Sequence, residues 1–205
     1  FEKEINYPVN VIYTDYFNEI DLDSYDVLVV PDGYYNLFNE NMLKKLSTWV
    51  SAGGNLVVMG SALKSFVDKD GFGLKNYATE EDKKEAEKEA MAKKEKEVLS
   101  RYEQDERKNI TSFINGGIFK TTMDNSHPLG YGYPNHYFTL TNGAAHYAYL
   151  SEGGNVAVIK DQASHISGFV GADVKGKMNE TLVFGVERKG GGHVIYMVDD
   201  PLYRD

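Results

Sequence analysis

The sequence contains no cysteine, and this absence removes several kinds of site at once. Disulfide bridges, zinc sites with thiolate ligands and a cysteine nucleophile are all excluded. The redox compartment stays open, because a cysteine-free chain suits either side of a membrane. No H-E-x-x-H motif is present, and the histidines are scattered over His127, His136, His146, His165 and His193. We therefore predict no metal site and no cofactor within this chain.

Long apolar runs and an excess of positive charge are also missing. No stretch approaches the roughly 20 apolar residues that a membrane-spanning helix needs, so no membrane span is predicted. The 31 acidic and 22 basic side chains give a net charge of −9, which repels a phosphate backbone and argues against nucleic-acid binding. With 41% hydrophobic and 26% charged residues, the 205-residue chain is able to bury a core as one domain.

The first part of the chain predicts strands that alternate with a helix. Residues 9–13 and 27–30 are short, valine-rich apolar runs, which favour strands. Residues 39–51 carry apolar side chains at helical spacing, and a Gly-Gly pair ends that helix. Residues 55–59 form the next apolar run. Strand, helix and strand with short connections predict a βαβ unit with parallel strands.

Residues 79–108 differ from the rest, because they hold 11 acidic and 9 basic side chains and few apolar ones. We interpret this segment as a solvated, charged helical insertion within a single domain that covers residues 1–205. Beyond it the pattern becomes strand-like, and the glycine-rich turn at residues 188–192 predicts a hairpin. Strands are expected over residues 118–122, 137–140, 155–159, 166–170, 182–187 and 193–198.

Several phrases, taken in their order along the chain, resemble a known family. They are Tyr25–Gly33, Ala62–Phe66, Met123–Leu129, Leu182–Gly185 and Val194–Leu202. Together they resemble the class I glutamine amidotransferase-like accessory domain that follows the peptidase domain in bacterial zinc carboxypeptidases of the carboxypeptidase A-like group. The resemblance implies an α/β fold of the Rossmann or flavodoxin-like type, with a mostly parallel sheet, the charged helical excursion and a C-terminal β-hairpin.

The resemblance also implies what would surround these residues. Residues 1–5 would be the tail of a first helix, and the chain would be a fragment that lacks its first strand. Its partner would be an upstream peptidase domain of the same polypeptide, which would supply the zinc and the catalytic residues. Such parents are exported, so a periplasmic or secreted location is expected. A homo-oligomer also stays open.

The turn after residues 55–59 is where catalytic chemistry in this fold would take place. The residue at the turn is Gly60, which has no reacting group, or Ser61. The neighbours of Ser61 at the second position on either side are methionine and leucine, which are too bulky for a standard nucleophile elbow. We therefore favour a turn without catalysis. A serine hydrolase that uses Ser61, with His127 as general base, stays open as the alternative.

Asp32 and Gly33 stand where amidotransferases of this kind form an oxyanion hole from backbone amides. A carboxylate at that place opposes a developing oxyanion, so we favour a turn in which Asp32 caps the backbone. Lys64 completes an S-x-x-K pattern with Ser61, but no K-T-G motif accompanies it. With Gly60, these residues are weak candidates for ligand binding.

Three functions remain open on the sequence. The leading hypothesis is a non-catalytic accessory domain that packs against the peptidase domain and shapes access to its active site. The second is the serine hydrolase. The third is a peptide- or glycan-binding module whose loop aromatics stack on the ligand, namely Tyr131, Tyr133, Tyr137 and Tyr147. Whether this chain alone is an enzyme is left open.

Overall fold

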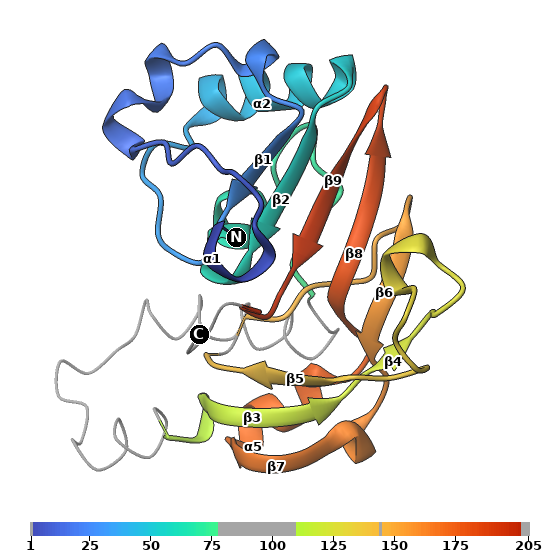
Figure 1. The fold of residues 1–205 in the computed structure, drawn as a ribbon. Helices are drawn as coiled ribbons and strands as arrows, with labels where there is room; N and C mark the ends of the chain where they lie inside the picture. Colours follow the sequence, from blue (N-terminus) through green and yellow to red (C-terminus); the bar gives the residue numbers. More distant parts are fainter. Residues whose placement is uncertain (1, 78–109, 144, 202–205) are drawn as a thin grey trace, which may run out of the picture.

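The computed structural model of the chain describes residues 2–77, 110–143 and 145–201. The predicted charged insertion over residues 79–108 lies outside these ranges. Two β-sheets form the body of the domain, one of six strands and one of three (Figure 1). The fold is therefore α/β, with a mixed larger sheet and few helices.

The six-stranded sheet has the order β1-β2-β9-β8-β6-β4. Its strands are β1 (Val27–Val30), β2 (Asn55–Met59), β4 (Thr122–Met123), β6 (Gly154–Ile159), β8 (Thr181–Lys189) and β9 (Gly192–Met197). The pairs β1–β2 and β2–β9 are parallel, whereas β9–β8, β8–β6 and β6–β4 are antiparallel. The prediction of a mostly parallel sheet is not confirmed, because only the three strands at one side run parallel.

The predicted βαβ unit and the C-terminal hairpin are confirmed. Helix α2 (Glu40–Ala52) connects β1 to β2, and the Asn39 side chain caps it by accepting a hydrogen bond from the amide of Met42. The buried face of α2 packs into the main core with Met42, Leu43, Leu46, Trp49 and Val50. At the hairpin, Lys189 of β8 pairs with Gly192 of β9 across the glycine turn.

The three-stranded sheet is antiparallel and has the order β5-β3-β7. It comprises β3 (Ile114–Lys120), β5 (Phe138–Thr141) and β7 (His165–Val170). One face packs on α5 (Ala172–Lys175) and on the larger sheet through Ile114, Phe119, Ile159, Val174, Met178 and Val183. The carboxyl ends of β2 and β9 point toward this small sheet (Figure 1). The space between the two sheets is therefore the place where loops from both can meet.

The remaining helices are short. They are α1 (Glu2–Ile5), η1 (Thr14–Glu19), η2 (Leu22–Ser24), η3 (Gly60–Ser65), η4 (Pro128–Gly130), η5 (Gln162–Ser164) and η6 (Gly176–Met178), the η elements being 3₁₀ turns. Of these, η3 follows β2 directly and replaces the expected simple turn. It places its residues at the carboxyl end of the parallel strands.

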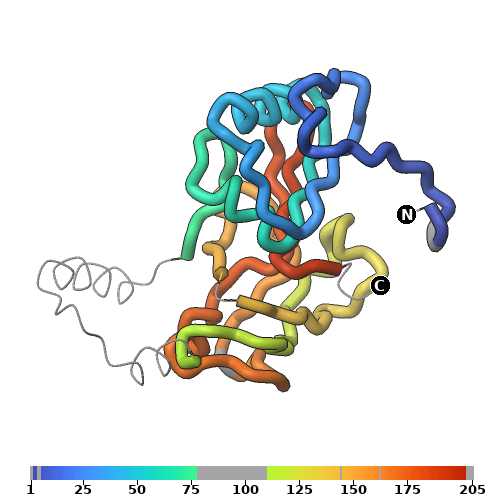
Figure 2. Tube along the Cα trace, turned by 90° about the vertical axis from the view of Figure 1, so that its left-hand side faces the viewer, coloured from blue at the N-terminus to red at the C-terminus, as the bar shows by residue number. Residues whose placement is uncertain are grey.

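The predicted strand over residues 9–13 is wrong. After α1 the chain runs through residues 6–13 without regular structure and projects from the body of the domain (Figure 2). Val11 is 78% exposed and Tyr13 is 71% exposed. A strand needs a neighbour that takes its backbone hydrogen bonds, and none of the described strands pairs with this segment. An apolar pattern is not sufficient to form a strand without that neighbour.

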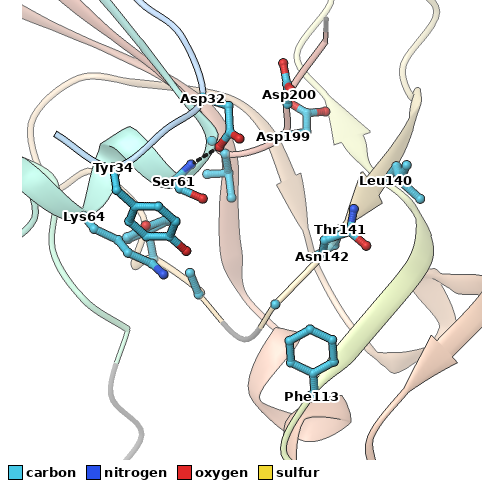
Figure 3. A pocket seen from close by; sticks show the side chains of 15 residues that line it. Asp32, Tyr34, Ser61, Lys64, Phe113, Leu140, Thr141, Asn142, Asp199 and Asp200 are labelled. Carbon is cyan, nitrogen blue, oxygen red and sulfur yellow. Dashed lines mark hydrogen bonds between the residues drawn. The ribbon is translucent and has the colours of Figure 1, made fainter. Parts of the chain in front are cut away.

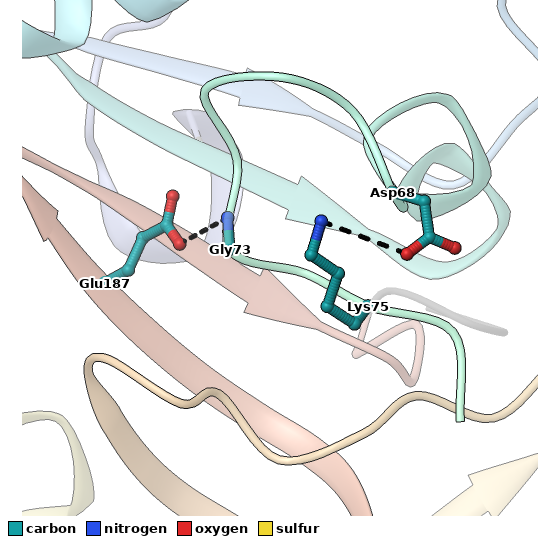
Figure 4. Close-up of polar contacts among 4 residues, drawn as sticks. All are labelled: Asp68, Gly73, Lys75 and Glu187. Carbon is teal, nitrogen blue, oxygen red and sulfur yellow. Dashed lines mark hydrogen bonds and ion pairs between the residues drawn. The ribbon is translucent and has the colours of Figure 1, made fainter. Parts of the chain in front are cut away.

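A buried carboxylate joins the loop after η3 to the β8–β9 hairpin. Glu187 is 7% exposed, and its oxygens accept hydrogen bonds from the amide of Gly73 at 2.7 Å (Figure 4) and from the hydroxyl of Tyr196 at 3.0 Å. Burial raises the pKa of Glu187, and the two hydrogen bonds offset only part of that rise. In the same view, Lys75 Nζ lies 4.0 Å from Asp68 Oδ1. This ion pair is exposed and adds at most about 1 kcal/mol.

The ionisation of Glu187 should appear in the pH dependence of stability. Between the unfolded glutamate pKa of about 4.3 and the raised folded value, the native protein binds more protons than the unfolded chain. Stability from this group therefore falls as the pH rises through that window, and Glu187→Gln removes the effect. Urea unfolding over a pH series should show wild type losing stability relative to this variant as the pH rises.

The control for this series is Glu152→Gln, because Glu152 is exposed. This variant should follow wild type across the whole range. Curves for wild type and Glu187→Gln that run parallel at every pH would show that Glu187 has no raised pKa in the folded protein.

Candidate functional site

A pocket of about 380 Å³ lies between the two sheets, at the carboxyl ends of the parallel strands (Figure 3). From the larger sheet and the segments that follow its strands come Asp32, Tyr34, Gly60, Ser61, Lys64, Val198, Asp199 and Asp200. From the small sheet and its loops come Phe113, Leu140, Thr141, Asn142, Gly143, Ala145 and Tyr147. Ligands of α/β sheets bind outside the carboxyl ends of parallel strands, so this is the expected position of a ligand site.

The bend after β2 is closed by Asp32. Its Oδ1 atom accepts a hydrogen bond of 2.6 Å from the backbone amide of Ser61 (Figure 3). Gly60 has a φ of +54°, and a Cβ atom at this position would collide with the same carboxylate. The residue at the bend therefore has no side chain, and the next amide already has an acceptor. An oxyanion hole needs such an amide to be free.

Ser61 and Lys64 both line the pocket from η3. Because a 3₁₀ helix has about three residues per turn, the two side chains project to the same side. The Lys64 ammonium nevertheless lies 5.2 Å from the centroid of the Tyr34 ring, in a cation–π contact. Among the described contacts, no hydrogen bond joins Ser61 Oγ to Lys64 Nζ. The lysine thus faces an aromatic ring and is not placed as a base for the serine.

His127 lies away from Ser61. Its imidazole lies against Gly154 at the start of β6, and its Nδ1 atom accepts a hydrogen bond of 3.2 Å from the amide of Leu129. In the sheet order β6 is three strand spacings from β2, or about 14 Å. None of the five histidines, all of which fall in the described ranges, lines the pocket. The structure does not bring the predicted pair of Ser61 and His127 together.

Most of the predicted binding residues do meet at this one place. Asp32, Gly60 and Lys64 line the pocket, whereas Gly33 lies against the ring of Tyr35 and is not part of the lining. Asp32 was expected to cap the backbone of its own turn. Its Oδ1 atom instead accepts a hydrogen bond from an amide 29 residues further along the chain. The carboxylate therefore joins two strand ends instead of one turn.

Two aspartates that follow β9 were missed at the level of sequence. Asp199 and Asp200 both line the pocket. Asp199 accepts hydrogen bonds from the side chain of Thr139 and, at 3.0 Å, from the hydroxyl of Tyr137. Burial raises the pKa of Asp199, and these hydrogen bonds offset part of the rise. Because Thr139 lies on β5 and Tyr137 directly precedes that strand, this contact joins the two sheets beside the pocket.

The four loop tyrosines proposed as a stacking surface have different environments. Tyr131 is 87% exposed and Tyr133 is 56% exposed, and neither lines the pocket. The hydroxyl of Tyr137 donates its hydrogen bond to Asp199. Tyr147 does line the pocket, but it is 2% exposed, and burial raises its pKa to about 12. Its hydroxyl has no hydrogen-bond partner within the described part of the chain.

The acidic side chains of the pocket are spread along the sheet edge. β1 and β9 flank β2, so the positions that follow them are two strand spacings apart, or about 10 Å. Accordingly, no group of three or more histidine or acidic residues in the described ranges is placed to hold a metal ion. The helices in these ranges include none that is long and apolar enough to cross a membrane.

Comparisons with known proteins find only distant similarity. No protein-family model matches the chain, and no curated protein matches it. Among solved structures, the β-galactosidase of Bacillus circulans sp. alkalophilus is 13% identical, with a TM-score of 0.45 over 89% of this chain and 21% of that chain. The β-galactosidase of Rahnella sp. R3 is 13% identical, with a TM-score of 0.45 over 94% and 22%.

A third solved structure is the cytoplasmic protein STM3548 of Salmonella typhimurium. It is 15% identical, with a TM-score of 0.44 over 87% of this chain and 62% of that chain. This chain thus spans about a fifth of the length of the β-galactosidases that it matches. Likenesses at this level carry no argument about activity.

The predicted kinship with the accessory domain of zinc carboxypeptidases is wrong. The solved structures named above are β-galactosidases and the protein STM3548, none of them a glutamine amidotransferase-like carboxypeptidase domain, and no family model matches the chain. Among the phrases that suggested it, Tyr25–Gly33 is an apolar strand followed by a turn, and Leu182–Gly185 lies on a strand of the hairpin at the end of the chain. Such phrases follow from the packing of α/β folds in general and do not specify one family.

Gly60→Ala should destabilise the protein more than Gly132→Ala. Both glycines have positive φ, +54° and +90°, a region in which a residue with a Cβ atom costs about 1–2 kcal/mol. The space around Gly132 is open, whereas an alanine at Gly60 also displaces Asp32. Urea unfolding should show the larger loss for Gly60→Ala, and introducing Asp32→Ala should shrink the difference. Equal losses at both glycines would contradict the close approach of Asp32 to the bend.

Proposed function

We propose that this chain is a non-catalytic α/β domain that binds a small polar ligand in the pocket at the carboxyl ends of β1, β2 and β9. The observation that carries the proposal is the hydrogen bond from the Ser61 amide to Asp32. Acyl transfer needs free amides that face the developing oxyanion. In this protein a carboxylate already accepts from the amide beside the bend, and its charge repels a second anion.

The size and lining of the pocket support ligand binding. Its volume of about 380 Å³ falls in the lower part of the range for small-molecule sites, about 300–1,000 Å³. Phe113 and Leu140 offer apolar surface, while Asn142 and the aspartates offer polar groups. This combination suits a compact ligand of one or two rings better than an extended peptide or glycan.

The other sequence hypotheses gain little from the geometry. The serine hydrolase would need a base near Ser61, and neither Lys64 nor His127 is placed for that role. A role beside a catalytic domain of a larger protein stays a prediction, as do an extracytoplasmic location and a homo-oligomer. We also propose that β1, α2, β2 and β9 are the parallel half of a flavodoxin-like sheet, to which the antiparallel strands are added on one side.

A fluorophosphonate probe, which labels activated serines, tests the absence of catalysis. Because no described contact gives the Ser61 hydroxyl a base and the Ser61 amide already donates to Asp32, native protein should label no more than heat-denatured protein. Ser61→Ala should therefore change nothing, and Ser51→Ala, at an exposed site on α2, is the matched control. Labelling of native protein that disappears in Ser61→Ala and persists in Ser51→Ala would contradict the proposal.

A further inference from the structure

The charges that line the pocket are unequal. Asp32, Asp199 and Asp200 bring three carboxylates, and Lys64 brings one ammonium. The chain as a whole has a net charge of −9, so the surrounding field has the same sign as the pocket. An anionic ligand would meet repulsion from both sources, whereas a cation is attracted by both.

Asp199 is a preorganised contact for such a cation. The Tyr137 hydroxyl donates to its Oδ2 at 3.0 Å, and Thr139 bonds to the same carboxylate, so its orientation is fixed before a ligand arrives. In its ionised form the carboxylate has about four acceptor positions, and the hydrogen bonds from Tyr137, Thr139 and its own backbone amide leave a position unused. A ligand ammonium therefore finds an acceptor that needs no rearrangement.

The rest of the lining suits the body of an organic cation. The aromatic rings of Tyr34 and Phe113 and the side chain of Leu140 lie on sides of the pocket away from Asp199 and Asp200 (Figure 3). The Tyr34 ring already accepts a cation on its face, since the Lys64 ammonium lies 5.2 Å from its centroid.

We infer that the ligand of the pocket is a small organic cation whose ammonium group lies at Asp199 and Asp200 and whose apolar part contacts Phe113 and Leu140. This inference rests on the proposed function, because it names the class of ligand for the same pocket. The inference excludes neutral sugars and polyols as the ligand, whereas the proposed function alone allows them.

Pairs of probes that differ in charge alone test the inference. Butane-1,4-diamine is compared with butane-1,4-diol, and glucosamine with glucose, by calorimetric titration at constant ionic strength. The amine of each pair should bind more tightly than its neutral partner. Asp199→Asn keeps an acceptor for Tyr137, so the fold should persist, yet it should weaken amine binding by roughly tenfold or more.

Two matched controls test whether amine binding takes place in the pocket. One control addresses the general charge of the protein, and the other addresses the position of a bulky substitution. Asp173→Asn, at an exposed position on α5, changes the net charge by the same amount and should leave amine binding unchanged. Leu140→Trp should reduce binding because Leu140 lines the pocket. Phe138→Trp lies on the same face of β5 outside the lining and should have no effect.

The outcomes distinguish the inference from the proposed function. If the diol or glucose binds in the pocket as tightly as its amine partner, the inference is overturned and the proposed function stands. Equal losses of amine affinity in Asp199→Asn and Asp173→Asn would show that the amines bind by nonspecific attraction to the negative charge of the protein. This result would also overturn the inference. Failure of all four probes to bind overturns it as well. Serine-dependent fluorophosphonate labelling would instead overturn the proposed function itself.

Discussion

The hydrogen bond between the Ser61 amide and the Asp32 carboxylate determines what the parallel half of this sheet can do. It joins the ends of β1 and β2, which helix α2 already holds as neighbours. It also requires glycine at position 60, because a side chain there would occupy the space of the carboxylate. A bend that elsewhere could present a nucleophile and a free amide is therefore filled by the protein itself, and the pocket beside it is suited to binding.

Both sheets line the pocket, and they are held together next to it. Tyr137 and Thr139 reach from the small sheet to Asp199 at the end of β9, while α5 and the second core cluster join the sheets further away. The carboxylate that we propose as a ligand contact, Asp199, is thus also part of the contact between the sheets. Changes in sheet packing and changes in ligand affinity are expected to accompany each other, which is why a substitution that keeps the acceptor atom is more informative than a truncation.

Local elements could be predicted from the sequence, while the assembly of the site could be predicted only in part. The strand, helix and strand from Val27 to Met59 and the final hairpin depend on neighbours in sequence, so periodicity revealed them. Asp32 and Gly60 were found together because one βαβ unit places both. The pairing of β2 with β9 joins Asn55 to His193, and no local pattern reveals it. For that reason the sequence alone predicts no role for Asp199, and it predicts for residues 9–13 a strand that has no partner.

The hydrogen exchange rate of the Ser61 amide, measured by NMR in wild type and in Asp32→Ala, tests the central claim most directly. An amide that donates to a carboxylate over 2.6 Å should exchange slowly in wild type and much faster once the carboxylate is removed. The amide of Met42, which donates to Asn39 at the start of α2, should be unaffected by the substitution. Equally fast exchange of the Ser61 amide in both proteins would show that the bend is open and would contradict its closure by Asp32.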